Sequence, residues 1–267
     1  MQITVVLPVK NGINGLAKTL ASILGQKNVT FEVLVLMGNS NDGTEEYVEQ
    51  FANDARVKIF RNQDSGIYAA MNFAIQESDN SWLVFMGAGD YFISPNVLEI
   101  YSQNLVNTDD WTIGSWFFLS EDNELIGSPA HQDFDIEHVP LTTTPLCHQT
   151  VFMHKKFLQK LKGFNESYKV ASDRDLILRA WMRKPPIKIN TALVCYLAGG
   201  FSSINESIGH RELRKIQKHY RLKKIKHKLF GGKSKIRPMS GLPGKGTQGD
   251  IALFNWVDQS VKNYYLK

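Results

Sequence analysis

The first ninety residues alternate between short apolar runs and longer segments that mix apolar and polar residues. Four apolar runs have the length of buried strands, and they span 2–9, 31–37, 57–60 and 82–86. Three segments between them are predicted helices. Residues 13–26 repeat apolar residues at helical spacing, 44–53 follow a cluster of turn residues, and 67–75 are apolar nearly all round, as in a helix buried between layers. Strands that alternate with helices of this length predict an α/β fold, in which a mostly parallel central sheet is flanked by helices.

The stretch that ends the fourth apolar run carries candidate chemistry. Gly87, Ala88 and Gly89 follow the predicted strand, and the single carboxylate of Asp90 comes next. Ligands bind beyond the carboxyl ends of strands in open α/β sheets, where a lone acid can hold a hard cation against a phosphate. A plain Gly-Asp turn after a core strand accounts for the same residues. Both alternatives stay open at this point.

The pattern weakens after residue 90. Strands are predicted at 112–119 and 187–197, and helices at 157–161 and 175–182. Residues 120–150 are irregular and polar, which is typical of a loop over a site. Earlier in the chain, Asp42 and Glu45 have the spacing of a capping box for the helix at 44–53. A flexible linker after residue 238 leads to an apolar segment at 251–266, through which two copies of the chain could form a homodimer.

Charged residues are distributed unevenly along the chain of 267 residues, whose net charge is +5. The segment 210–237 holds twelve Lys or Arg and one acid, so the remainder is mildly acidic. Its apolar residues fall near one helical face, at Leu213, Ile216, Tyr220, Ile225 and Leu229. This pattern favours an anionic membrane surface, while packing of the apolar stripe on the body and nucleic-acid binding are the alternatives.

The lengths of the apolar runs, the first residues and the cysteines indicate which classes of protein to expect. No apolar run approaches the ~20 residues of a membrane-spanning helix, and the first residues do not resemble a signal peptide. Cys147 and Cys195 match no metal spacing, so we expect buried free thiols in a reducing compartment. These features predict a cytoplasmic protein.

Several stretches together resemble the family 2 glycosyltransferases with a GT-A fold, and most of all the bacterial members that build surface polysaccharides such as O-antigen. The matching stretches occur in the family's order, at 5–11, 38–44, 64–72, 85–90, 147–152 and 164–173. The resemblance covers roughly residues 3–203. It implies that a sugar moves from a nucleotide diphosphate, most simply a UDP-sugar, to a hydroxyl with inversion. The acceptor it implies is a glycan, often linked to a lipid.

The resemblance also implies roles for individual residues. The donor-binding residues it implies are Pro8, Val9, Asn39, Asp64, Gly66, Asn72 and Gly89. Ordinary turn chemistry accounts equally for Asn39 and Gly66, and a helix cap accounts for Asp64.

The family's metal position falls on Asp90, which would hold Mg²⁺ or Mn²⁺ against the diphosphate. The position of the catalytic base falls on Asp173, for which an N-cap of the following helix is the alternative. His148 and Gln149 would border the acceptor or the diphosphate. Farther along the predicted helix, the spacing of Arg179 predicts a structural ion pair with Asp175.

Three positions depart from the family pattern. Met37, Gly87 and Gly89 stand where relatives often carry acids, so a catalytically impaired nucleotide-sugar-binding protein is one alternative. A basic nucleic-acid-binding protein is another. We expect a transferase domain at 1–208, with a donor half (1–110) and an acceptor half (111–208), and a basic extension at 209–267. A peripheral position on the cytoplasmic face of the inner membrane fits this organisation.

Overall fold

The computed structural model describes residues 2–61, 65–105, 111–120, 125–127 and 147–228. Within these residues the strands form one nine-stranded sheet, in the order β3-β2-β1-β4-β8-β6-β9-β5 with β7 paired to β6. The strands are β1 (Gln2–Val9), β2 (Thr30–Met37), β3 (Val57–Phe60), β4 (Trp82–Phe85), β5 (Tyr91–Phe92), β6 (Trp111–Leu119), β7 (Leu125–Gly127), β8 (Val151–His154) and β9 (Ile187–Leu197). The helices are α1 (Ile13–Leu24), α2 (Thr44–Glu49), α3 (Ile67–Glu77), α4 (Val97–Asn104), the 3-10 turn η2 (His148–Thr150), α5 (Lys155–Lys160), α6 (Ser172–Trp181), α7 (Phe201–Ile204) and α8 (Glu206–Lys228).

The first four strands run parallel, as the alternation predicts. The residues of β1, β2 and β4 are buried almost throughout because helices cover both faces of the sheet, while β3 at its edge is mostly only partly buried. The register pairs Val9 with Met37, so β1 and β2 end at the same edge. The loops that follow β1, β2 and β4 therefore gather at that edge, where ligands bind in open α/β sheets.

The second half of the sheet is mixed. β6 and β9 occupy predicted segments and pair parallel, while β8 lies antiparallel between β4 and β6, and β5 pairs antiparallel with β9. The sequence does not predict β5, β7, β8, α4 or α7. Each has eight residues or fewer, which is too short for a periodic pattern to identify.

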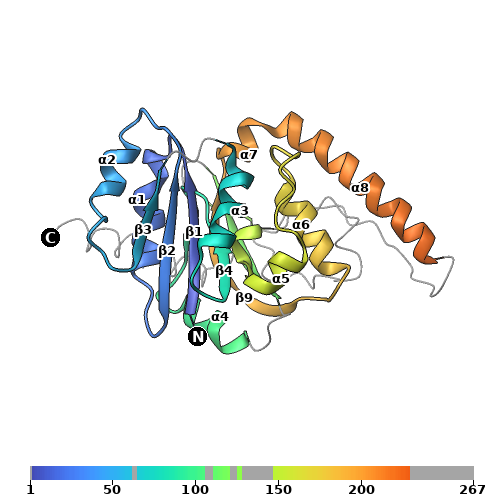
Figure 1. Ribbon diagram of the computed structural model, residues 1–267, viewed down its shortest axis with the longest axis horizontal. Coiled ribbons are helices and arrows are strands. Elements are labelled where there is room, and N and C mark those ends of the chain that lie inside the picture. The colour runs from blue at the N-terminus through green and yellow to red at the C-terminus, as the bar shows by residue number, and fades with distance from the viewer. Residues whose placement is uncertain (1, 62–64, 106–110, 121–124, 128–146, 229–267) are drawn as a thin grey trace.

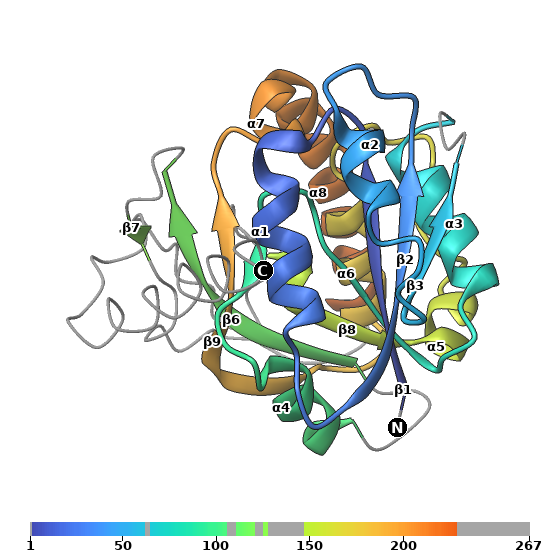
Figure 2. The same cartoon turned by 90° about the vertical axis from the view of Figure 1, so that its left-hand side faces the viewer.

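Helices form a layer on each face of the sheet (Figures 1 and 2). One hydrophobic cluster joins the sheet to α1, α2 and α4, and a second joins the opposite face to α3, α5 and α6. Figure 1 shows α8 running along the outside of α6. None of the helices in the described part of the chain is long and apolar enough to cross a membrane.

The predicted capping box at α2 does not form. Gly43, with φ +92°, occupies the N-cap position of α2. Asp42 Oδ1 accepts from the N–H of Thr44, and Asp42 Oδ2 accepts from the N–H of Ile13, 3.1 Å away in each case. Asp42 therefore satisfies a free N–H at the start of α1, a contact between loops that local spacing does not reveal.

Helix α8 packs on the body through the first part of its apolar stripe. Leu213, Ile216 and Tyr220 join Ala171 and Leu178 in a third hydrophobic cluster. Ile216 and Tyr220 are buried and Leu213 is partly buried, so this part of the stripe packs on the body, as the packing alternative expects. Ile225 belongs to the part of α8 whose side chains are not described, and residues 229–267 lie outside the described residues.

Two buried carboxylates hold α8 in place. Tyr220 Oη donates to Asp175 Oδ1 at 3.2 Å, and Arg179 Nε donates to Asp175 Oδ2 at 2.8 Å. The second contact confirms the predicted ion pair. Glu212 accepts three hydrogen bonds from the backbone N–H groups of residues 169–171, at 2.8–3.0 Å. The segment that leads into α6 is thus held against α8.

Candidate functional site

The loops at the carboxyl ends of β1 and β2 are bonded to each other. The N–H of Asn11 donates to Ser40 Oγ at 3.0 Å, and the N–H of Asn41 donates to Asn11 Oδ1 at 2.9 Å. Pro8 and Val9 are buried at the end of β1, and Asn39 is exposed in the second loop. These predicted donor-binding residues share one edge of the sheet. Their contact with a nucleotide stays a prediction.

The small residues after β4 are used for packing inside the protein. A Cβ on Gly15 would lie 2.5 Å from the Cα of Gly89, so α1 rests directly on this turn. Gly89 has φ +107°, and its N–H donates to Thr19 Oγ1 at 2.9 Å. Gly89 is buried, and its small size allows this close helix contact; its role beside a donor stays a prediction.

Met37 also takes a structural role. Its side chain is 1% exposed and lies in the cluster beneath α1 and α2. The position where relatives often carry an acid is therefore part of the core in this chain.

The residues near α3 that were predicted to bind the sugar donor have different surroundings in the structure. Gly66 is exposed, has φ +108° and precedes the first residue of α3, and a Cβ at this position would meet no atom within 4 Å. Asn72 instead clasps a neighbouring loop, because its Nδ2 donates to the carbonyl of Phe164 and its Oδ1 accepts from the N–H of the same residue. Its amide serves packing, and its contact with the donor stays a prediction. Asp64 lies outside the described residues.

Asp90 is a buried carboxylate between β4 and β9. It is 6% exposed, and it accepts a hydrogen bond on each oxygen, from Gln149 Nε2 at 2.5 Å and from the N–H of Leu197 at 3.1 Å. Burial raises the pKa of Asp90 to about 6, although the two donors partly offset that effect. The space beside it depends on Gly87, since a Cβ there would lie 2.8 Å from Asp90 Oδ2.

Asp173 lies in the first turn of α6, one residue inside the helix. The N-cap is Ala171, whose side chain makes no capping bond, so the N-cap alternative for Asp173 is wrong. Asp173 Oδ2 lies 3.1 Å from His148 Nδ1, and Tyr68 Oη donates to Asp173 Oδ1 at 3.3 Å. Burial alone would raise the pKa of Asp173, but the hydrogen bond and charge of His148 lower it overall.

A single 3-10 turn connects the two carboxylates. His148 and Gln149 are consecutive residues of η2, and their side chains bond Asp173 and Asp90 respectively. Cys147 Sγ donates to Gln149 Oε1 at 3.1 Å, which orients the amide so that its nitrogen faces Asp90. The predicted acceptor-side pair thus brings together the predicted metal ligand and the predicted base, which lie 83 positions apart in the sequence.

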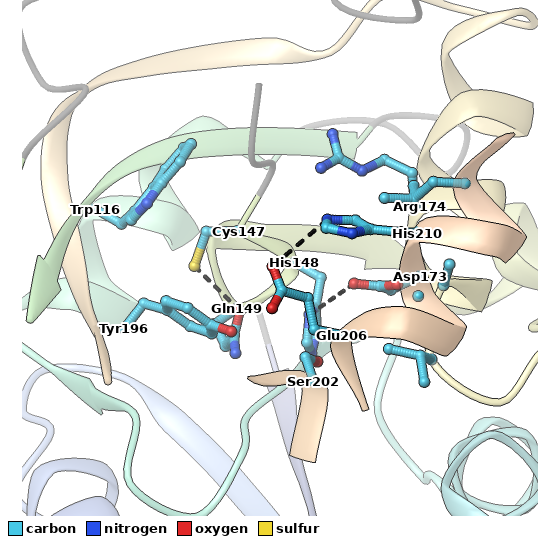
Figure 3. Close-up of a pocket in the computed structure, with 14 residues that line it drawn as sticks. Trp116, Cys147, His148, Gln149, Asp173, Arg174, Tyr196, Ser202, Glu206 and His210 are labelled. Carbon is cyan, nitrogen blue, oxygen red and sulfur yellow. Dashed lines mark hydrogen bonds and ion pairs between the residues drawn. The ribbon is translucent and has the colours of Figure 1, made fainter. Parts of the chain in front are cut away.

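A cavity of about 220 Å³ opens beside this turn (Figure 3). It is smaller than the ~300–1,000 Å³ of sites that enclose drug-sized ligands, so it suits one part of a larger ligand. Asp173, His148 and Gln149 line it. Other lining side chains come from β6, β9, α6, α7 and α8, and they are Trp116, Tyr196, Arg174, Ser202, Glu206 and His210.

The sequence did not identify the second group of lining residues as functional. Glu206 and His210 lie at the start of α8, where they form a long ion pair of 3.6 Å. They belong to a basic helix whose pattern indicates a surface, and no local spacing connects them to Asp173. The cavity is therefore completed by part of the C-terminal extension.

The side chains around Asp90 limit how a divalent cation can bind. In the part of the chain that the structure describes, no group of three or more His, Cys, Asp or Glu side chains could hold a metal ion. Mg²⁺ is usually held by one or two carboxylates together with substrate phosphates and water. The residues present fit a cation shared between Asp90 and a bound diphosphate, and they do not fit a cation held by protein alone.

The chain is similar to known glycosyltransferases in sequence. A PGL/p-HBAD biosynthesis glycosyltransferase of Mycobacterium bovis (BCG) is 24% identical over 216 residues, which cover 79% of this chain and 82% of that protein. The glycosyltransferase GlyA of Streptococcus pneumoniae is 26% identical over 121 residues, covering 45% of this chain and 17% of that protein.

Solved structures with the same fold include two nucleotide-sugar complexes. S. aureus TarS 1–349 in complex with UDP-GlcNAc gives a TM-score of 0.64 at 16% identity, over 77% of this chain and 61% of that chain. The mannosyltransferase PcManGT from Pyrobaculum calidifontis, in complex with GDP-Man and Mn²⁺, gives a TM-score of 0.57 at 18% identity. The match covers 76% of this chain and 59% of that chain. This chain spans about three-fifths of both solved chains, and the likeness confirms the predicted GT-A fold.

The family model described as Glycosyl transferase family 2 matches residues 4–162, which is more than half of the chain. The match begins in β1 and continues through α5, so it includes both Asp90 and the η2 turn. The chain belongs to glycosyl transferase family 2.

Proposed function

We propose that this glycosyltransferase moves a sugar from a nucleotide-diphosphate donor to an acceptor hydroxyl with inversion at the anomeric carbon. The donor would lie at the carboxyl ends of β1, β2 and β4, and the acceptor in the cavity beside η2. A UDP-sugar is the donor we favour. The TarS structure contains UDP-GlcNAc and the PcManGT structure contains GDP-Man, which supports a nucleotide sugar and leaves the base to be tested.

The observation that carries the proposal is the double contact made by η2. Transfer needs a group that receives the acceptor proton and a group that offsets the charge of the departing diphosphate. The Asp173–His148 pair faces the cavity, and Gln149 connects that pair to Asp90. A direct displacement with inversion requires these two functions on opposite sides of the reacting carbon.

A divalent cation, Mg²⁺ or Mn²⁺, would supply charge stabilisation of the leaving diphosphate. Asp90 is the residue that would hold it, together with oxygens of the donor. The PcManGT structure contains Mn²⁺, which supports this part of the proposal. Cation binding should therefore depend on the nucleotide.

The acceptor and location we propose are a lipid-linked glycan at the cytoplasmic face of the inner membrane, in assembly of a cell-surface polysaccharide. The mycobacterial relative is named as a PGL/p-HBAD biosynthesis glycosyltransferase, which supports a role in a biosynthetic assembly pathway. Exposed basic residues of α8 could attract anionic lipid by charge, and those with described side chains are Arg211, Arg214, Lys215 and Lys218.

The test is a thermal-stabilisation screen of UDP- and GDP-sugars with and without Mn²⁺, followed by calorimetric titration of the best donor. We expect stabilisation by a UDP-sugar that increases with Mn²⁺, little binding of Mn²⁺ alone, and release of UDP on incubation. Binding that ignores Mn²⁺ and gives no UDP release would instead indicate the impaired binding protein. Failure of every nucleotide sugar to bind would refute the proposal.

A further inference from the structure

The short helix α7 exposes two large apolar side chains. Among the residues that the structure describes, three large apolar side chains are exposed, and two of them are Phe201 (52%) and Ile204 (81%) in α7. They are three positions apart on one helical turn, so they lie on the same side of it. Single exposed apolar residues are common on protein surfaces, and Met182, the third, is one of them. The pair in α7 forms a small apolar surface.

Hydrogen bonds within α7 fix the position of this pair. The N–H of Ile204 donates to the carbonyl of Gly200 at 3.2 Å. Asn205 donates to the carbonyl of Phe201 twice, from its backbone N–H at 3.2 Å and from Nδ2 at 2.9 Å. The exposure of Phe201 and Ile204 is therefore a property of a closed, hydrogen-bonded turn.

The helix that follows carries positive charge on its exposed side. Only Asn205 separates α7 from α8. Glu212, Ile216 and Tyr220 of α8 are buried against the body. The exposed positions of α8 before Tyr220 hold four Lys or Arg and one acid, and they are Glu206, Ser207, His210, Arg211, Arg214, Lys215, Lys218 and His219. Apolar side chains beside a basic helix face are the two features that bind a protein to the surface of an anionic membrane.

Helix α7 also forms part of the wall of the cavity beside η2. Ser202, which lies between Phe201 and Ile204 in the sequence, lines this cavity together with Glu206 and His210 of α8 (Figure 3). The apolar pair is therefore next to the site where we propose that the acceptor binds. A lipid surface that covered the pair would hold the sugar end of a lipid-linked acceptor close to the cavity.

We propose that α7 is the edge of this protein that enters the membrane surface, with Phe201 and Ile204 among the headgroups of an anionic bilayer and the exposed basic face of α8 against the lipid phosphates. This inference rests on the proposed lipid-linked acceptor and names the surface that faces the lipid. The apolar pair sets the orientation of the protein on the membrane. The basic residues add an attraction that salt weakens.

Other partners would use these features differently. A second copy of the chain joined through α7 would bring two basic faces together, and like charges in contact oppose association. Nucleic acid would bind the basic face through its phosphates and would not need the apolar pair. An anionic lipid surface uses both features, which is why we favour it.

The first experiment attaches the environment-sensitive fluorophore NBD to Ile204→Cys in the full chain. Cys147 and Cys195 are buried, so the label reacts with the new thiol of the native protein. Vesicles of phosphatidylcholine and phosphatidylglycerol in equal parts should raise the NBD emission by about twofold and shift it to shorter wavelength, because the label moves from water into lipid. The matched control is Met182→Cys, which replaces a side chain as exposed as Phe201 and lies at the end of α6 far from Asp173, and its label should not respond.

The second experiment measures partitioning onto the same vesicles by co-sedimentation. Phe201→Ser combined with Ile204→Ser should lower the partition coefficient by about tenfold, whereas Met182→Ser should not change it. Lys215→Glu should lower it by about tenfold at low salt, and Lys27→Glu, an equal change of charge on an exposed residue beyond α1, should have little effect. High salt should weaken the effect of Lys215→Glu and leave that of the serine variant.

The outcomes separate this inference from the proposed function. The inference is wrong if the label on Ile204→Cys stays in water, or if the serine variant partitions like the unsubstituted chain. It is also wrong if the serine variant converts a dimer to a monomer and leaves vesicle binding unchanged. In each of these cases, stabilisation by a UDP-sugar would leave the proposed sugar transfer standing. Entry of the label into lipid without binding of any nucleotide sugar would support the membrane surface and refute the proposed function.

Discussion

Replacement of Glu212 by alanine tests how the C-terminal extension is held to the transferase body. The Glu212 carboxylate is 8% exposed and accepts from the backbone N–H groups of Lys169, Val170 and Ala171. The segment 169–171 leads directly into α6 and Asp173. Glu212→Ala removes the only side-chain acceptor that the structure describes for these three N–H groups.

The expected loss of stability follows from the number of buried N–H groups that lose their acceptor. Lys169 is exposed, so water can replace its bond, but Val170 and Ala171 are buried. An unsatisfied buried N–H costs about 1–3 kcal/mol, so we expect Glu212→Ala to lower the free energy of unfolding by about 3 kcal/mol. That is a large share of the ~5–15 kcal/mol of a typical domain, and it corresponds to a fall in Tm of about 10 °C.

The assay is urea and thermal denaturation of Glu212→Ala beside Glu206→Ala. Glu206 is on the same helix, and its side chain is 72% exposed, so its removal should cost less than about 1 kcal/mol. Glu212→Gln, which keeps one oxygen acceptor, should fall between Glu212→Ala and the unsubstituted chain. If the free energy of unfolding of Glu212→Ala lies within about 1 kcal/mol of that of the unsubstituted chain, the carboxylate does not hold α8 to the body.

The remaining predictions concern the carboxylate site and the thiols. Asp90→Asn should retain the fold by circular dichroism and abolish sugar transfer, and turnover at the unsubstituted rate would remove Asp90 from the site. Gly87→Ala should lower turnover at least tenfold, because its Cβ would lie 2.8 Å from Asp90 Oδ2; unchanged activity would show that the carboxylate position is not critical. Burial raises the pKa of Cys195 to about 12 and that of Cys147 well above its ordinary value, so both thiols are protonated at pH 8. A disulfide reagent such as DTNB should therefore react with neither until denaturant is added, and fast reaction of the native protein would contradict their burial.

The pattern of apolar residues was enough to predict the first half of the fold. The predicted strands at 2–9, 31–37 and 57–60 match β1, β2 and β3 to within a residue. Apolar runs of this kind form because strands buried on both faces need apolar residues at nearly every position. Local periodicity also predicted the Asp175–Arg179 pair, since residues four apart on a helix are neighbours wherever the helix lies.

For the site, the sequence supplied candidate residues but not the contacts between them. Six stretches resembling the family identified Asp90, Asp173, His148 and Gln149 before any contact between them was known. Which oxygen each side chain bonds depends on η2, and this turn has no periodic pattern. The contacts of Asn72 and Gly89 could not be predicted for the same reason, because their partners come from distant segments.

Tertiary packing was needed to show that the basic extension completes the cavity. In the sequence, Leu213, Ile216 and Tyr220 form an apolar stripe that would suit a membrane or a protein surface equally well. Packing against α6 buries Ile216 and Tyr220 and part of Leu213, and it brings Glu206 and His210 to the cavity that Asp173 lines. Amphipathic spacing indicates that the apolar face of a helix must be covered. Only the three-dimensional arrangement determines what covers that face.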